Sequence, residues 1–387
     1  MLKKMYLVAF DYRMADGSLP RFGDAVQDSI SKPFAGNEAA YAAYHDARLL
    51  ANLSAKPTWD SVILGRRTGD KPPALEGGSK VFPGTGNAVL RTNGPGRLSA
   101  AITFSPHGGF HGHFDKLSFV FFGDGRELGV DPGHAASQAY GLPIHKDWYR
   151  ATIGHNAVLV NGRGQKEADG QLVAFGATAD WAGVTADAGR AFEGVVQRRT
   201  LILGPACLVV VDHLKATDEK ERRFAWLYHN LGSGMACDLP AAKVDLVGVA
   251  GSEYLKHTKA YYTDRAGTIA VSFSDSAGDV RLMMAGQPGD TVITADGPFR
   301  SVEDRVPMAA VQRRGSEVTF VAVIEPLPKG GPATVKGVTV STGPVVRIDC
   351  GGRSDVVTFQ GGAAGGIFRI EETGGDQALI EKLSVKP

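Results

Sequence analysis

Apolar residues recur at helical spacing in the first part of the chain. Residues 1–14 and 37–53 are rich in Ala, Leu and Met, with apolar positions three and four residues apart, which is typical of amphipathic helices. Asn37 is a residue type that often begins a helix. The sequence ADGSLPRFGDA between the two stretches is a turn cluster. We therefore expect a helical segment over residues 1–70.

A different pattern begins near residue 80. Short runs of β-branched and aromatic residues, among them KLSFVFFGDGREL, HNAVLVNGRGQ and EVTFVAVIEPL, end at Gly, Asp or Pro, as strands do. FGDG and VNGRG have the composition of hairpin turns. The pattern predicts a mainly β protein. We expect a large antiparallel β-sandwich over residues 76–328 and a small C-terminal β segment over residues 329–387.

Composition supports this picture and excludes some functions. The 50 glycines and 20 prolines favour many turns and many short strands. The formal net charge of +1 argues against a protein that binds nucleic acid through bulk charge. Three widely spaced cysteines argue against a disulfide framework. Neither a membrane-spanning apolar stretch nor a signal peptide is predicted, so we expect no membrane insertion, and a bacterial location in periplasm or cytoplasm stays open.

Histidines concentrate in one part of the chain. Six of the ten fall within residues 107–155. If the sequence HGHFD is extended, His111, His113 and Asp115 point to one face. Two imidazoles and a carboxylate on one face suit a metal ion or acid–base chemistry. The alternative is a set of structural histidines that only make hydrogen bonds.

Two later residues can complete such a site. Asp131 follows the predicted hairpin of LSFVFF and ELGV, and a hairpin returns the chain to near its start, so Asp131 can lie beside His113. His155 begins the predicted strand HNAVLV and can close the set. A His, Asp and His site completed by water is reasonable for zinc. Asp131 precedes Pro and Gly, so a turn residue is the alternative.

The sequence KDWYRATIGHN places a tyrosine next to an arginine. Tyr149 has the residue type of a core or rim aromatic. Arg150 offers a bidentate fork for a carboxylate or sulfate group. The pair therefore suits the binding of a sugar acid, and Arg150 is a candidate substrate-binding residue.

These segments together resemble a known family. HGHFDKLSFVFFGDGRELGVDPG followed by WYRATIGHNAVLVNGRGQ is similar to the heparinase II/III-like polysaccharide lyases, which include heparinases and oligoalginate lyases. The resemblance continues through RRTLILGPACLVVVDHLKA and reaches ADGSLPRFGDA. It implies an N-terminal α/α toroid, of which residues 1–70 would be the end, and a C-terminal antiparallel β-sandwich. It also implies β-elimination at a uronic acid of alginate or glycosaminoglycan chains.

The resemblance also implies roles for single residues. His111 would line the catalytic cleft, Tyr149 would match a tyrosine of the sandwich domain, and we expect both to be catalytic residues that face the substrate. His113, Asp131 and His155 match the positions of the family's structural zinc ligands. The metal would then orient the loops of the sandwich and would not attack the substrate.

One feature of the family is expected to be absent. In the family, the toroid supplies an Asn or His that neutralises the substrate carboxylate and a Tyr or His base, upstream of the segment that resembles LPRFGD. We expect this chain to lack them. Whether it is active alone or needs a toroid domain or partner chain stays open. Two rivals remain: a non-catalytic carbohydrate-binding or structural module, and a zinc-dependent hydrolase or isomerase on a β-fold with His111, His113 and His155 at the metal.

Overall fold

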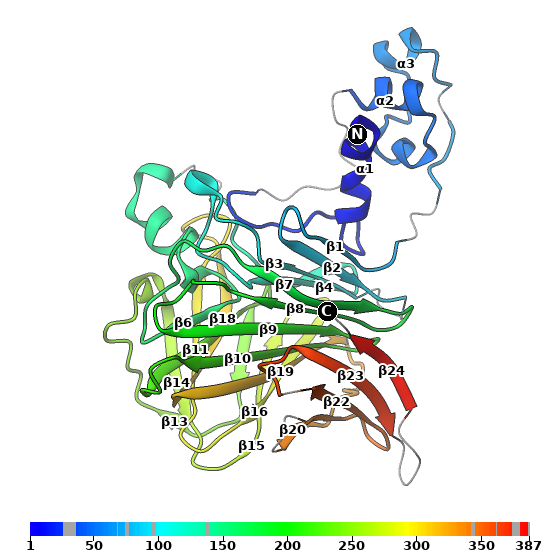
Figure 1. Cartoon of the computed structure of the whole chain (residues 1–387). Helices are drawn as coiled ribbons and strands as arrows, with labels where there is room; N and C mark the ends of the chain where they lie inside the picture. The colour runs from blue at the N-terminus through cyan, green and yellow to red at the C-terminus, as the bar shows by residue number, and fades with distance from the viewer. Residues whose placement is uncertain are drawn as a thin grey trace.

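The computed structural model describes residues 1–25, 36–67, 69–73, 77–93, 98–135, 139–341, 345–360, 362–373 and 380–385. Helices at the N-terminus project from one side of a body of stacked β-sheets (Figure 1). Strands dominate the described residues and every printed strand pair is antiparallel. The predicted mainly β, antiparallel fold is confirmed. No described helix has the length and apolar character needed to cross a bilayer.

The N-terminal helices pack on one another. They are α1 (Leu2–Tyr12), α2 (Asn37–Tyr44), the 3₁₀ helix η1 (Ala47–Asn52) and α3 (Trp59–Ile63). Leu7 and Phe10 of α1, one helical turn apart, pack with apolar residues of α2 and η1. The helix predicted over 37–53 is interrupted, because His45 takes a left-handed backbone conformation with φ of 49° and ends α2.

The described strands form four sheets. The sheet orders are β1-β2-β3-β4-β5, then β12-β15-β16-β19-β10-β9-β8-β7, then β13-β14-β17-β18-β11-β6, and finally β20-β21-β22-β23-β24. The bounds in chain order are β1 Lys80–Phe82, β2 Asn87–Arg91, β3 Ser99–Thr103, β4 Phe119–Gly123, β5 Arg126–Gly129, β6 Val158–Val160, β7 Gln171–Ala177, β8 Ala182–Asp187, β9 Val195–Leu203, β10 Leu208–Ala216, β11 Arg222–His229, β12 Gly234–Cys237, β13 Ala241–Ala242, β14 Lys256–Tyr262, β15 Gly267–Ser274, β16 Gly278–Gly286, β17 Thr291–Pro298, β18 Arg305–Gly315, β19 Glu317–Pro328, β20 Gly337–Ser341, β21 Val345–Asp349, β22 Ser354–Gln360, β23 Ile367–Thr373 and β24 Ile380–Val385.

The sheet that contains β10 is the middle layer. Leu208 and Val210 of β10 belong to a core shared with the sheet of β11 and the sheet of β1–β5. Val209 and Val211 point the other way, into a core shared with the C-terminal sheet of β20–β24. Because β10 is buried on both faces, its first four residues, 208–211, are an unbroken apolar run and not an alternating one.

Between the strands of the sandwich, the described residues form five short helical turns. They are η2 (Gly109–His111), η3 (Ala139–Gly141), the π-helix η4 (His145–Tyr149), η5 (Thr152–Gly154) and η6 (Ser252–Tyr254). Three of them, η4, η5 and η6, pack on the outer face of the sheet that contains β11. Trp148 and Ile153 pack there against Leu227 and Ile293 of the sheet. These turns, and the loop that follows η2, carry the histidines singled out in the sequence.

A buried ion pair connects the core to these loops. Arg199 on β9 and Asp212 on β10 are both inaccessible to solvent and lie 2.8 Å apart. The guanidinium of Arg199 also donates to the carbonyl oxygens of Leu117, at 2.6 Å, and Asn156. Leu117 has a left-handed backbone with φ of 65°. The Arg199–Asp212 pair therefore holds the chain in place at Leu117, where the backbone is strained, and at Asn156.

Charged side chains also attach the segment that follows α1 to the sandwich. Arg91 on β2 is buried and donates to the carbonyl oxygens of Asp11 and Gly78, at 2.5 and 2.6 Å, and to that of Arg13, at 2.9 and 2.5 Å. Arg21 forms a buried ion pair of 2.5 Å with Glu127 on β5. Residues 12–25 are thereby held along the first sheet.

Candidate active site

A cleft of about 430 Å³ lies between residues 12–25 and the loop 105–116. Its lining includes Tyr12, Phe22, Asn87, His111 and His113. A larger hollow of about 760 Å³ lies on the C-terminal sheet, but its lining contains no histidine. The cleft beside His111 therefore holds the groups that can carry acid–base chemistry.

Asp24 joins the two histidines of HGH. Its Oδ2 accepts from Nδ1 of His111 at 2.8 Å, and its Oδ1 accepts from Nε2 of His113 at 3.0 Å. The hydroxyl of Tyr140 donates to Oδ2 at 3.1 Å. Burial acts to raise the pKa of Asp24, but the bonds from the two histidines outweigh it and hold that pKa well below its usual range. Asp24 is thus a permanent anion at neutral pH.

The environments of His111 and His113 differ. The side chain of His111 is 71% exposed, whereas that of His113 is inaccessible. Since Nδ1 of His111 donates to Asp24, its Nε2 carries the lone pair in the neutral ring. His111 therefore presents a basic nitrogen at the cleft, while His113 faces the protein interior. The segment around them is a 3₁₀ turn followed by irregular chain, so the extended conformation considered for HGHFD is not formed.

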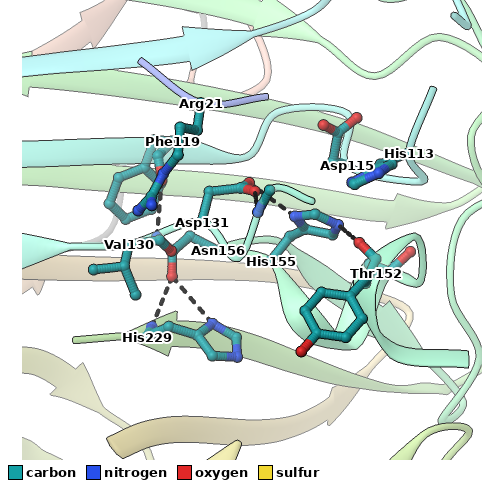
Figure 2. A network of polar contacts seen from close by, with 12 residues as sticks. Arg21, His113, Asp115, Phe119, Val130, Asp131, Thr152, His155, Asn156 and His229 are labelled. Carbon is teal, nitrogen blue, oxygen red and sulfur yellow. Dashed lines mark hydrogen bonds and ion pairs between the residues drawn. The ribbon is translucent and has the colours of Figure 1, made fainter. Parts of the chain in front are cut away.

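A buried group of potential metal ligands lies behind the cleft. One ligand atom from each of Asp115, Asp131 and His155 lies within 4.8 Å of the others. Figure 2 shows that His113 lies beside Asp115, a member of this group. The centroids of the imidazole rings of His113 and His155 are 5.2 Å apart. Nδ1 of His113 is buried and has no hydrogen-bond partner among the described residues. Asp131 and His155 of the predicted trio thus lie together with Asp115, and the ring of His113 lies beside this group without belonging to it.

Asp131 and His155 already form an ion pair. Oδ2 of Asp131 lies 2.8 Å from Nδ1 of His155, and Nε2 of His155 donates to the carbonyl oxygen of Tyr149 at 3.0 Å. Burial acts to lower the pKa of His155, but the Asp131 carboxylate outweighs it and raises that pKa. Next to the pair, the amide of Asn156 bridges the carbonyl oxygens of Phe119 and Val130 (Figure 2).

Tyr149 and Arg150 lie differently from the sequence-based expectation. The side chain of Tyr149 is completely buried in the apolar cluster of Trp148 and Ile153, and burial raises its pKa to about 12. It has no surface in the cleft, so in this structure Tyr149 does not face a substrate. The guanidinium of Arg150 donates to the carbonyl oxygens of Gly112 at 3.0 Å and Gly109 at 3.2 Å. Arg150 therefore supports the turn that carries His111.

Comparison with known proteins identifies the family. Residues 75–314 match the family described as "Heparinase II/III-like, C-terminal", and this segment is more than half of the chain. The chain belongs to the heparinase II/III-like family. The predicted family is thereby confirmed.

The relatives of this heparinase II/III-like chain include polysaccharide lyases. It is 31% identical over 159 residues to an alginate lyase of Stenotrophomonas maltophilia, covering 36% of this chain and 21% of the relative. It is 29% identical over 133 residues to an exo-oligoalginate lyase of Saccharophagus degradans, covering 30% and 18%. The solved heparan sulfate lyase HepC of Pedobacter heparinus superposes with a TM-score of 0.66 at 14% identity, covering 98% of this chain and 52% of that structure. The chain thus matches about half the length of HepC and about a fifth of the alginate lyases.

Two residues of the candidate site were not predicted from the sequence. Asp24 lies in the turn ADGSLPRFGDA, 87 positions before His111. Tyr140 on η3 contacts the rings of Phe110, His134 and His145 at centroid distances of 4.5 to 5.6 Å. The turn cluster around Asp24 was a visible signal, because it is one of the segments that resemble the family.

Proposed function

We propose that this chain is a polysaccharide lyase that performs β-elimination at a uronic acid of alginate or glycosaminoglycan chains. The observation that carries the proposal is the exposed imidazole of His111, fixed by the buried Asp24 carboxylate at the edge of a cleft. Lyases of alginate and heparan sulfate among the similar proteins support it. A histidine oriented by a carboxylate is an arrangement suited to moving protons.

The chemistry assigns a task to each group. A base removes the C5 proton of the uronate, the electron pair forms the C4–C5 double bond, and the C4–O bond breaks while the leaving oxygen takes a proton. Nε2 of His111 can take up a proton, as the base in this step must. Burial, together with the bond to Asp24, raises the pKa of Tyr140, so its hydroxyl stays protonated and suits a proton donor. We assign the proton donor to Tyr140, whose hydroxyl bonds to Asp24, and not to Tyr149, whose side chain is buried.

A zinc ion is part of the proposal. Asp131 and His155 would hold it, with the unpartnered Nδ1 of His113 and the carboxylate of Asp115 as neighbouring donors. Two carboxylates and two imidazoles form a donor set that fits zinc once the metal takes the place of the proton between Asp131 and Nδ1 of His155. When bound, zinc would supply structural crosslinking between the loops 111–116 and 152–157. Its removal would therefore lower the stability of the chain first.

Turnover tests the proposed function. The purified chain is offered alginate, heparan sulfate, heparin, hyaluronan and chondroitin oligosaccharides, and the ultraviolet absorbance of the unsaturated product is followed. We expect a rise on at least one substrate and none for the His111→Ala variant. A folded, zinc-loaded chain that binds an oligosaccharide without any rise would contradict the proposal and favour a carbohydrate-binding module.

Metal content separates the lyase from a zinc hydrolase. The lyase assignment predicts that His111→Ala keeps its zinc, because His111 lies at the cleft and not in the buried ligand group. Loss of zinc from that variant would refute the division of roles. In the hydrolase alternative, chelation abolishes hydrolysis, and added zinc restores it.

A further inference from the structure

Phe110 exposes its ring at the edge of the cleft. Phe110 is 66% exposed. Every other phenylalanine in the described part of the chain is buried or half-buried. The ring is 5.1 Å from that of His111 in an edge-to-face arrangement. It stacks on Tyr140 with a centroid distance of 5.6 Å and an interplanar angle of 23°. A single exposed apolar residue is common, but this one contacts two groups of the site.

The turn that carries Phe110 is held from several sides. Arg150 donates to the carbonyl oxygens of Gly109 and Gly112. The amide of Gly112 donates to the carbonyl oxygen of Gly109, and the amide of Asp24 donates to that of His111. Gly109 has φ of 61°, a conformation that favours glycine. The exposed ring is therefore presented by a fixed backbone, so little freedom is lost when a ligand covers it.

The chemistry of the ring indicates its ligand. A pyranose has faces of C–H groups that can lie on an aromatic ring, while its hydroxyl and carboxylate groups stay available for hydrogen bonds. We propose that Phe110 is a sugar-stacking residue that binds the pyranose next to the one at His111. This inference rests on the proposed function and deepens it. The stacked Tyr140 supports the ring from behind, so that the pair forms a platform on the cleft edge.

Four variants of the full chain test this assignment. Phe110→Leu keeps an apolar side chain without a ring, whereas Phe110→Tyr and Phe110→Trp keep a ring. Trp59→Ala is the matched control, because Trp59 is a larger exposed aromatic residue at 83% exposure and lies on α3, which contributes no residue to the cleft, whereas the turn of Phe110 contributes His111. Alginate and heparan sulfate tetrasaccharides are titrated by calorimetry while product absorbance is recorded. The readout is Kd where there is no turnover, and KM and kcat where there is.

The expected result is a loss of binding without a loss of fold. Phe110→Leu should raise Kd or KM by about tenfold, with thermal unfolding unchanged because the side chain is exposed. Phe110→Tyr, Phe110→Trp and the Trp59→Ala control should stay within about twofold of the parent, well below the effect of ring removal. Equal binding by Phe110→Leu and the parent, or equal weakening in all three Phe110 variants, would overturn this inference alone. No binding of either saccharide by the parent would overturn it together with the proposed substrate class.

Discussion

Replacing Asp24 by alanine removes the carboxylate that three side chains share. His111 is largely exposed and can turn to water, so its lost bond costs little. His113 is buried, and its Nε2 loses its hydrogen-bond acceptor. The hydroxyl of Tyr140 loses the same acceptor. A hydrogen bond to a charged group contributes about 1.5–3 kcal/mol. We therefore expect Asp24→Ala to lower the free energy of unfolding by about 2–4 kcal/mol.

Urea denaturation of parent and variant measures this loss. Asp16→Ala is the matched control, since the printed bonds of the Asp16 side chain go to Ser18 in its own turn, and its effect should stay below about 1 kcal/mol. Asp24→Asn keeps one acceptor oxygen and should fall between the two. If Asp24→Ala unfolds within about 1 kcal/mol of the parent, the carboxylate does not hold the site together and its assigned role is wrong.

Three further substitutions have expected outcomes. Arg91→Met removes the donor from the carbonyl oxygens of Asp11, Gly78 and the buried Arg13 and should cost about 2–4 kcal/mol in urea unfolding, with faster proteolytic cleavage within residues 12–25; unchanged cleavage would contradict the docking role. Arg199→Met leaves the buried Asp212 carboxylate without its counter-ion, although Gln197 and Trp226 still donate to it, and should cost about 3–5 kcal/mol by the same measurement; a loss below about 1 kcal/mol would be incompatible with this role. Asp131→Asn should weaken zinc binding by about tenfold or more, measured by competition with a chromogenic chelator, and unaltered affinity would place the metal elsewhere.

The sequence predicted the fold better than the contacts of the site. Strand patterns such as LSFVFF depend on local alternation and burial, and the hairpin of β4 and β5 forms where they indicate. Asp24 was missed because nothing local shows that a turn residue will meet His111 across 87 positions. Tyr149 was selected by its resemblance to a tyrosine of the family, and Tyr140 was not weighed; both lie in short helical segments, where one residue step changes the direction of a side chain by about 100°. Which of the two is buried depends on the sheet beneath them.

The attachment of residues 12–25 has a consequence for motion. This wall of the cleft is fixed by Arg91 at one end, by the Arg21–Glu127 ion pair in the middle and by Asp24 at the site itself. Separating it from the sandwich would expose buried charges and carbonyl oxygens, so it cannot swing as a lid. Any hinge that admits a saccharide must therefore lie outside this wall. Residues 12–25, which bind His111 through Asp24, therefore form a rigid wall of the cleft.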